Sequence, residues 1–221
     1  QPDQGMPIVE IGPGLGALTA YLADYPNVSL IELEQAFCEQ LRTKYPQLNV
    51  INQDVRLVDF SQFGDKIFVF GNLPYSFSTD IVFHLLESSN VVARAVLMLQ
   101  REFVERMSAA PGSRTYGKLS ITVQAWADLR LGPVIPGDSF HPKAKVDSQL
   151  VELKLHHGAK YGLSDLDRIW LRRVVQAAFF KRRKKLLNSM RSSGVLQTFD
   201  IGQVLELVGI DPETRAETIG V

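Results

Sequence analysis

The sequence predicts an α/β fold with a mostly parallel sheet that has antiparallel end strands, followed by a small all-α C-terminal domain. Three observations support this prediction. Short apolar runs alternate with amphipathic stretches through the first half of the chain, two β-rich segments follow around a loop that contains prolines, and the last quarter has only helical patterns.

Five short apolar runs in the first hundred residues are predicted to be buried strands, because they are rich in Val, Ile, Leu and Phe and are flanked by polar or turn residues. They lie at 6–11, 28–31, 48–51, 67–70 and 93–99. Helices are predicted at 15–23, 34–44 and 79–87, the last with Ser78 as its N-cap. Alternation at this spacing predicts a parallel sheet that is covered on both faces.

The pattern changes after residue 118. A predicted helix at 119–127 precedes two β-rich segments at 129–135 and 149–155, which we expect to pair antiparallel at the end of the sheet. A loop with two glycines at 156–164 then separates helical segments at 165–191 and 201–208 from the rest. We therefore predict two domains, 1–157 and 158–221.

Composition indicates a soluble globular chain, since its 221 residues are 45% hydrophobic and 22% charged. Cys38 is the single cysteine, and no apolar run reaches the roughly 18 residues that span a bilayer, so we expect a reduced, cytoplasmic setting without a membrane. The net charge is zero, but residues 1–90 hold 4 Lys/Arg against 11 Asp/Glu and residues 91–221 hold 20 against 13. Such asymmetry is compatible with a nucleic-acid partner.

A glycine turn after the first predicted strand suggests a nucleotide-type ligand. Gly12 and Gly14 allow close approach of the backbone to a ligand, and Glu32 follows 20 residues later, at the end of the next strand, where an acid can bind ribose hydroxyls. Both NAD and S-adenosylmethionine contain an adenosine ribose, so these residues do not separate the two cofactors. Asp54 and the amide of Val55, after the third strand, could bind a cofactor adenine.

The segment Asn72-Leu73-Pro74-Tyr75, at the end of the fourth strand, indicates methyl transfer to an amino group conjugated to a ring. The lone pair of such a nitrogen is delocalised, so two fixed acceptors, the Asn72 amide oxygen and the Leu73 carbonyl, could hold its N–H groups and favour tetrahedral geometry. Pro74 stiffens the loop, and the Tyr75 ring can stack on a base. An adenine inside a helix would have to be extruded to reach this loop.

Nearly the whole chain resembles the family of small-subunit ribosomal RNA adenine dimethyltransferases, which is related to the macrolide-resistance methylases and to mitochondrial transcription factor B. The motifs that carry the resemblance are Val9–Gly16, Ile31–Glu34, Gln53-Asp54, Gly71–Thr79, Met98–Glu102, Tyr116–Ser120, Phe140–Ser148 and Phe180–Arg191.

The resemblance implies a Rossmann-like, S-adenosylmethionine-dependent enzyme that dimethylates N6 of two adjacent adenines in the 3′-terminal hairpin of small-subunit (16S) rRNA during ribosome biogenesis. Its partner would be the immature 30S subunit, and we expect a monomer. The family pattern implies that Gly12 and Gly14 meet the methionine part of the cofactor, that Glu32 binds ribose, and that Asp54 and Val55 bind adenine. Asn72 would lie between cofactor and target amine and contact both. The remaining implied site residues are Leu73, Pro74 and Tyr75, with Phe140 facing the target base opposite Tyr75.

Two departures from the family pattern lead to expectations. Ala144 replaces the second proline of the loop that carries Phe140, which predicts a looser loop. The family also has an upstream segment that closes over the cofactor and a final helix, so we expect this chain to be truncated at both ends, with weakened binding of cofactor and RNA.

Residues 168–191 hold nine Lys/Arg and no acid, with apolar residues at helical spacing, which predicts a basic helix that binds RNA phosphates. The expected RNA-binding residues are Arg172, Lys181, Arg182, Arg183, Lys184 and Lys185. The four histidines have no ligand spacing, so no metal is expected.

Three alternatives stay open at this point. The glycine turn and Glu32 alone would also suit a nicotinamide-dependent oxidoreductase. A large-subunit rRNA methylase of the macrolide-resistance type is a second alternative, although Gly71-Asn72-Leu73-Pro74-Tyr75 favours the small-subunit enzymes. A non-catalytic RNA-binding assembly factor on the same scaffold is the third.

Overall fold

The computed structural model describes residues 5–156 and 164–221. These residues form two compact units, which are described separately: one comprises 5–104 and 126–156, and the other comprises 105–125 and 164–221. The sequence analysis placed 105–125 in the first domain, whereas the structure groups this segment with the second unit. The predicted boundary between 157 and 158, and most of the predicted loop at 156–164, lie outside the described residues.

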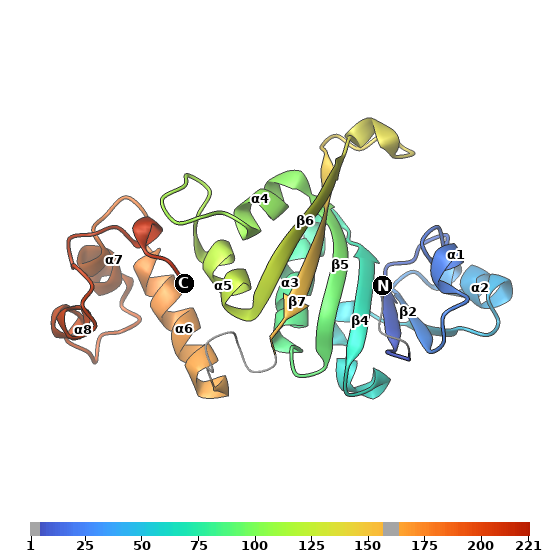
Figure 1. Ribbon diagram of the computed structural model, residues 1–221, viewed down its shortest axis with the longest axis horizontal. Helices are drawn as coiled ribbons and strands as arrows, with labels where there is room; N and C mark the ends of the chain where they lie inside the picture. The colour runs from blue at the N-terminus through green and yellow to red at the C-terminus, as the bar shows by residue number, and fades with distance from the viewer. Residues whose placement is uncertain (1–4, 157–163) are drawn as a thin grey trace. The chain divides into compact units, whose positions relative to one another are not determined.

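Seven strands of the first unit form one sheet in the order β3-β2-β1-β4-β5-β7-β6. Neighbours from β3 to β5 run parallel, and β7 runs antiparallel to both β5 and β6. This arrangement confirms the predicted Rossmann-like sheet. Figure 1 shows the β6–β7 pair reaching beyond the rest of the sheet. The strands are β1 (Ile8–Ile11), β2 (Val28–Glu32), β3 (Asn49–Asn52), β4 (Ile67–Asn72), β5 (Val92–Gln100), β6 (Ala127–Ile135) and β7 (Ser148–Leu155).

The register of the parallel strands brings their carboxyl ends together. Ile11 at the end of β1 pairs with Ile31 on one side and with Gly71 on the other, and Glu32 pairs with Asn52. Ligands of open α/β sheets bind outside these carboxyl ends, where the strand order reverses. β1 and β4 are such a reversal point, so the predicted glycine turn and the Asn72 loop both start there.

The helices of the first unit differ from prediction at three places. The helix predicted at 15–23 is only α1 (Thr19–Leu22), because Gly16 has a φ of +81°, which a right-handed helix cannot contain. The N-cap of α3 (Ser78–Glu87) is Phe77, so the prediction for Ser78 was wrong. α4 (Arg101–Met107) follows β5 directly and was not predicted.

Two further helices agree with the prediction. α2 (Gln35–Lys44) contacts β2 and β3, and α5 (Lys118–Trp126), which lies in the second unit except for its last residue, precedes β6. One apolar cluster of the first unit contains residues of β1, β2, β3, α1 and α2. Its buried members are Ile8, Leu22, Val28, Leu30, Cys38, Leu41 and Val50.

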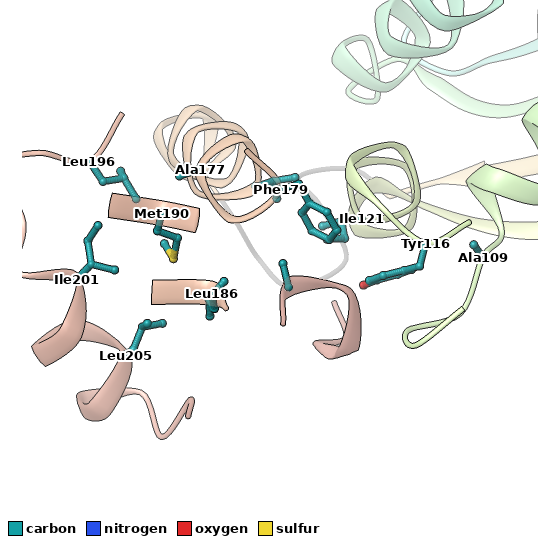
Figure 2. Close-up of a cluster of buried hydrophobic side chains, with 12 residues drawn as sticks. Ala109, Tyr116, Ile121, Ala177, Phe179, Leu186, Met190, Leu196, Ile201 and Leu205 are labelled. Atoms are coloured by element: carbon teal, nitrogen blue, oxygen red, sulfur yellow. The ribbon is translucent and has the colours of Figure 1, made fainter. Parts of the chain in front are cut away.

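The second unit is helical, as predicted for the end of the chain. It contains α6 (Asp165–Ala178), α7 (Leu186–Ser193) and α8 (Ile201–Leu207), and Ser164 caps α6 in a capping box with Asp167. Figure 2 shows Leu186 and Met190 of α7 in the same apolar cluster as Leu205 of α8. Burial of these side chains holds the unit together.

The basic helix predicted at 165–191 is interrupted. α6 ends at Ala178 and α7 starts at Leu186, and the buried Ser189 hydroxyl joins their ends: it donates to the Ala177 carbonyl (3.1 Å) and accepts from the Lys181 amide (2.9 Å). Residues 181–185, five consecutive cations, therefore lie in the connection between the two helices. Like charges on one helical turn repel, so an uncapped continuous helix through them would be unfavourable.

Candidate active site

The glycine turn after β1 has the backbone that its sequence requires. Gly12 and Gly14 have φ values of +65° and +55°, which favour glycine, and the Gly12 amide donates to the Ile31 carbonyl at 2.9 Å. A Cβ at Gly14 would meet no atom within 4 Å, and one at Gly12 would lie 3.8 Å from the backbone oxygen of Asn72. The turn is therefore open on one side and next to the acceptor loop on the other.

Glu32 lies buried at the end of β2 and holds this turn. One carboxylate oxygen accepts from the Gly14 amide (3.0 Å), and the other accepts from the Glu34 amide (3.0 Å). The same carboxylate that was predicted to bind ribose thus also orders the glycine turn. Each oxygen has a second lone pair with which a ligand hydroxyl could bond.

Glu10, on β1, is a second buried carboxyl near the turn, and the sequence analysis did not single it out. Its side chain is 2% exposed and accepts a 2.7 Å hydrogen bond from the Thr19 hydroxyl. Burial raises the pKa of Glu10 to about 7, whereas the Thr19 bond acts to lower it and the charge of Glu32 acts to raise it.

This raised pKa predicts that Glu10 makes the fold less stable as pH rises. The folded protein holds the Glu10 proton more tightly than the unfolded chain, so the contribution is fully present below the unfolded pKa of about 4.5 and is lost as pH rises through about 7. At 1.36 kcal/mol per pKa unit, we expect the free energy of unfolding to fall by about 3 kcal/mol across this window. Urea unfolding near pH 5 and near pH 8 should show this loss in the wild type, and Glu10→Gln should remove it. Equal pH dependence in both proteins would contradict the prediction.

Asp54 follows β3 and caps the short 3₁₀ helix η1 (Val55–Leu57) by accepting from the Arg56 amide at 3.0 Å. The Arg56 guanidinium also binds this carboxylate, with Nη2 at 2.5 Å from Oδ2. Hydrogen bonds from Arg56 hold the pKa of Asp54 below its usual value. Val55 is buried beside it. The sequence analysis missed Arg56, because the pattern of a strand-end acid does not indicate its partner.

The acceptor loop leaves β4 at Asn72. The Asn72 side chain is exposed, while the Leu73 side chain is 1% exposed and its amide donates to the Met98 carbonyl at 3.2 Å. The Pro74 carbonyl accepts from the Phe77 amide (3.2 Å) and from the Ser78 hydroxyl (3.1 Å). Burial of Leu73 and these bonds hold the loop from both sides, so its backbone has a defined direction.

Tyr75 is partly exposed and is held from a distant strand. Its hydroxyl forms a 2.9 Å hydrogen bond with the hydroxyl of Ser148, which starts β7 and is 1% exposed. Ser148 lies in a motif that carried the family resemblance, but no role followed from its sequence. The bond fixes the hydroxyl end of Tyr75, while 38% of the residue stays exposed.

Phe140 lies half-buried in the connection between β6 and β7. The Ala144 amide donates to the Gly137 carbonyl at 3.0 Å, a bond that proline could not make because it has no N–H. The looser loop expected from Ala144 stays a prediction. The Gly137 amide in turn donates to the Asp147 carboxylate at 3.1 Å. The predicted pairing of the Phe140 and Tyr75 rings stays a prediction.

Four of the six predicted cofactor residues line one cleft at the carboxyl ends of β1, β2 and β3, whereas Gly14 and Asn72 are not among its lining residues. Its lining includes Gly12, Glu32, Asp54, Val55 and Pro74 from the prediction. The other lining residues are Ile11, Ile31, Leu33, Gln53, Arg56, Phe77 and Ile81. Polar groups from separate strands thus face one concave, largely apolar space, which suits a nucleoside.

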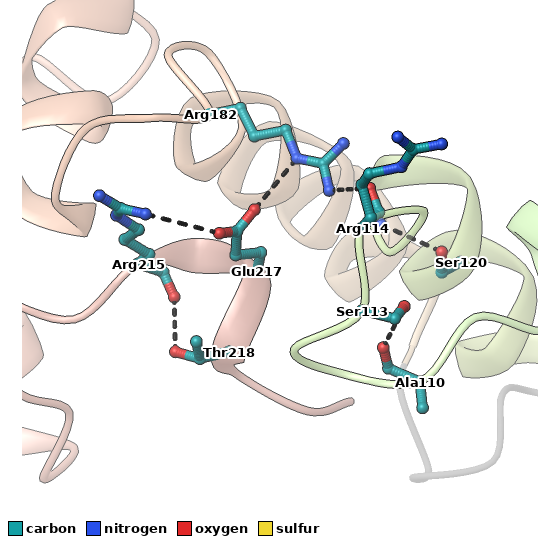
Figure 3. Close-up of polar contacts among 9 residues, drawn as sticks. Ala110, Ser113, Arg114, Ser120, Arg182, Arg215, Glu217 and Thr218 are labelled. Atoms are coloured by element: carbon teal, nitrogen blue, oxygen red, sulfur yellow. Dashed lines mark hydrogen bonds and ion pairs between the residues drawn. The ribbon is translucent and has the colours of Figure 1, made fainter.

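The predicted RNA-binding residues lie in the second unit and are not equivalent. Figure 3 shows the Arg182 guanidinium between the Glu217 carboxylate (3.1 Å) and the Arg114 carbonyl. Lys185 pairs with Glu213. Arg172 is exposed on α6, and Lys181, Arg183 and Lys184 are exposed in the connection from α6 to α7. Arg182 and Lys185 therefore each pair with an acidic residue of the same unit.

The described residues, 5–156 and 164–221, contain no metal-binding cluster and no helix that could span a membrane. There, no three His, Cys, Asp or Glu side chains gather where they could hold a metal ion. His157 lies outside the described residues. None of the helices in 5–156 and 164–221 has the length and apolar character needed to cross a bilayer.

The sequence of this chain is similar to known proteins over nearly its whole length. The family model described as ribosomal RNA adenine dimethylase matches residues 1–220. A ribosomal RNA small subunit methyltransferase A from Mannheimia succiniciproducens is 37% identical over 233 residues, covering 100% of this chain and 78% of the relative.

Two solved structures show the same fold. A dimethyladenosine transferase from Plasmodium falciparum has a TM-score of 0.84 at 24% identity, and the match covers 98% of this chain and 86% of that one. The 23S rRNA methyltransferase ErmE has a TM-score of 0.72 at 21% identity, covering 98% and 87%. At these identities the likeness shows the fold alone.

Proposed function

Because this chain belongs to the ribosomal RNA adenine dimethylase family, we propose that it transfers methyl groups from S-adenosylmethionine to N6 of two adjacent adenines in the 3′-terminal hairpin of small-subunit (16S) rRNA. The observation that carries the proposal is the short distance between the glycine turn and the acceptor loop: a Cβ at Gly12 would lie 3.8 Å from the Asn72 backbone oxygen. A methyl donor bound at the glycine turn and a target amine bound at the Asn72 loop would therefore lie next to each other.

The residues of the cleft suit the proposed cofactor. Gly14 leaves room above the turn for the methionine part, the buried Glu32 carboxylate can accept from ribose hydroxyls, and Asp54 with Val55 can bind the adenine edge. S-adenosylmethionine would supply an electrophilic methyl on a sulfonium. No acid or base of the protein needs to act on that group.

The protein's part in the reaction is to orient the target amine. The Asn72 amide oxygen and the Leu73 carbonyl would accept its two N–H groups and draw the nitrogen lone pair out of conjugation with the ring. Transfer would break the sulfonium–methyl bond, leave S-adenosylhomocysteine, and release one proton from the methylated nitrogen to solvent. A single N–H then remains, and one acceptor is enough to hold it. The same loop can therefore serve the second transfer.

The target adenine would have to leave its stack to reach this loop. The Tyr75 ring, held through Ser148, offers a face for the extruded base, and stacking of this kind contributes about 1–3 kcal/mol. Phe140, on the β6–β7 connection, is proposed to cover the other face of the base. Both aromatic residues position the base, and neither moves a proton.

The second unit is proposed to bind RNA through Arg183, Lys184, Lys181 and Arg172. We predict that the Arg183→Ala/Lys184→Ala double variant binds small-subunit rRNA more weakly, because each exposed cation that contacts a phosphate releases counterions on binding. The slope of log affinity against log salt should fall by about 1 for each lost contact. Filter binding with a hairpin fragment at several salt concentrations would measure this slope.

Arg182→Ala is the matched control, since it removes a neighbouring cation that has a structural role. Because this variant loses the contacts of Arg182 with Glu217 and the Arg114 carbonyl, its free energy of unfolding in urea should be lower by about 1 kcal/mol. The salt slope should change little. An unchanged slope in the double variant would exclude Arg183 and Lys184 from the RNA contact.

The function is tested by incubating the protein with labelled S-adenosylmethionine and small subunits from a strain without adenine dimethylation. We expect label in two adjacent adenines of the 3′-terminal hairpin, as dimethyladenosine. Label in large-subunit RNA would instead indicate a resistance-type methylase. Tight RNA binding without transfer would indicate a non-catalytic assembly factor. Two observations support the small-subunit activity: the similarity to the small subunit methyltransferase A of Mannheimia succiniciproducens, and the loop Gly71-Asn72-Leu73-Pro74-Tyr75.

A further inference from the structure

Arg56 covers the adenine end of the cofactor cleft in a way that the proposed function does not use. Its Nε lies 3.0 Å from Oδ1 and 3.1 Å from Oδ2 of Asp54, and its Nη2 lies 2.5 Å from Oδ2. The backbone amide of Arg56 donates a further hydrogen bond to Oδ1 of Asp54 at 3.0 Å. Both oxygens of the acid that should receive the adenine amino group are thus already bonded.

The same guanidinium also covers an aromatic face of the cleft. Its central carbon lies 4.4 Å from the centre of the Phe77 ring, within the range of a cation–π contact. A weaker ionic contact joins Nη1 to the Asp80 carboxylate at 3.9 Å. Phe77 and Arg56 both line the cleft, so one side chain occupies a ring face and a carboxylate that a bound adenine would contact.

Three N–H groups of Arg56 already bond to the about four lone-pair sites of the Asp54 carboxylate, so a nucleobase amino group competes with Arg56 for this acid. The Arg56 side chain is 37% exposed, so it can move into solvent without disturbing the core. An exposed ion pair is weak and is screened by salt, which makes such an exchange feasible. The free energy of the Arg56–Asp54 ion pair should lower the affinity for any ligand that carries an adenosine.

We infer that Arg56 is a further residue of the cofactor cleft that sets cofactor affinity, by competing with the adenine amino group for Asp54 and with the adenine ring for Phe77. The inference rests on the proposed function, since it requires an adenosine-containing cofactor. It makes Arg56 a residue that opposes binding, whereas the other residues of the cleft favour it.

The test compares calorimetric affinities for S-adenosylhomocysteine in the wild type and in Arg56→Met, which keeps the length of the side chain and removes its charge. We expect Arg56→Met to bind about two- to fivefold more tightly, the range set by an exposed ion pair. Arg94→Met is the matched control: Arg94 pairs with Glu152 (3.6 Å) at a distance from the cleft lining, so its affinity should equal that of the wild type.

Two further measurements identify the competition itself. In an Asp54→Asn background the ion pair is gone, so Arg56→Met should add less affinity than in the wild type, and the remaining gain should come from the freed Phe77 ring. Methylthioadenosine is uncharged, and its affinity for the wild type should rise between about 0.05 and about 0.5 M salt as the pair is screened, but should not rise for Arg56→Met.

The outcomes separate the inference from the proposed function. Equal or weaker binding by Arg56→Met, with the wild type binding normally, would overturn the competition and leave the proposed function intact. Failure of both proteins to bind S-adenosylhomocysteine and methylthioadenosine would overturn both. Thermal melting checks that each variant is folded, which is expected because Arg56 lies on the surface.

Discussion

Replacing Asn72 by alanine is expected to lower the rate of methyl transfer by about 100- to 1000-fold while cofactor affinity stays nearly unchanged. Loss of one fixed acceptor that acts in the transition state typically has an effect of this size. Asn72 is exposed at the end of β4, and the loop behind it is held by the buried Leu73, so the truncation should not unfold the site. Single-turnover transfer to undermethylated small subunits, with S-adenosylhomocysteine calorimetry alongside, would measure the two quantities.

Two companion variants sharpen this result. Asn72→Asp keeps an acceptor oxygen and should retain more activity than Asn72→Ala. Asn49→Ala removes an exposed asparagine on β3, outside the cleft lining, and should transfer methyl groups normally. Equal loss of cofactor affinity and of transfer rate in Asn72→Ala would show that Asn72 holds the cofactor and does not orient the amine.

Replacing Glu32 by alanine is expected to damage both the fold and cofactor binding. The variant leaves the part-buried amides of Gly14 and Glu34 without their charged acceptor, at a cost of about 3 kcal/mol in the free energy of unfolding. The glycine turn would lose its tether, and the ribose would lose its acceptor. We expect the dissociation constant of S-adenosylhomocysteine to rise by about 100-fold or more.

The comparison of Glu32→Gln with Glu34→Ala separates these effects. Glu32→Gln keeps the size of the side chain and one acceptor oxygen, so its stability should lie between those of the wild type and Glu32→Ala. Glu34→Ala removes an exposed carboxylate next to the same backbone and should change little. Calorimetry and urea unfolding would show it. Wild-type cofactor affinity in a folded Glu32→Ala protein would contradict the proposed contact with ribose.

Prediction was most successful where the conformation of a segment depends on the residues of that segment alone. Alternating apolar runs and amphipathic stretches predicted the strands at 28–31 and 67–70 within two residues of their observed ends, because a strand buried on both faces must be apolar throughout. Prediction failed at Gly16 and Ser78. Gly16 adopts a positive φ that glycine allows, and the Ser78 hydroxyl donates to the Pro74 carbonyl and does not cap α3.

The candidate site shows the same division. The glycine turn, Glu32, Asp54 and the loop at Asn72 could be proposed from sequence because their residue types suit one chemistry at strand ends. Arg56 and Ser148 could not. Ser148 bonds with Tyr75 across 73 positions of sequence, so only the pairing of β7 with β5 makes the contact possible.

The sequence by itself determined the class of sheet, the glycine turn and the acceptor loop, because these depend on the backbone freedom of glycine, the rigidity of proline and the alternation of apolar runs. Tertiary structure alone decided which charged groups have partners. The sequence does not distinguish the five cations at 181–185 from one another. In the structure Arg182 binds Glu217, 35 positions away, while its neighbour Arg183 is exposed to solvent. Ion pairs depend on distances of a few ångströms, and those distances arise only when packing brings distant segments together.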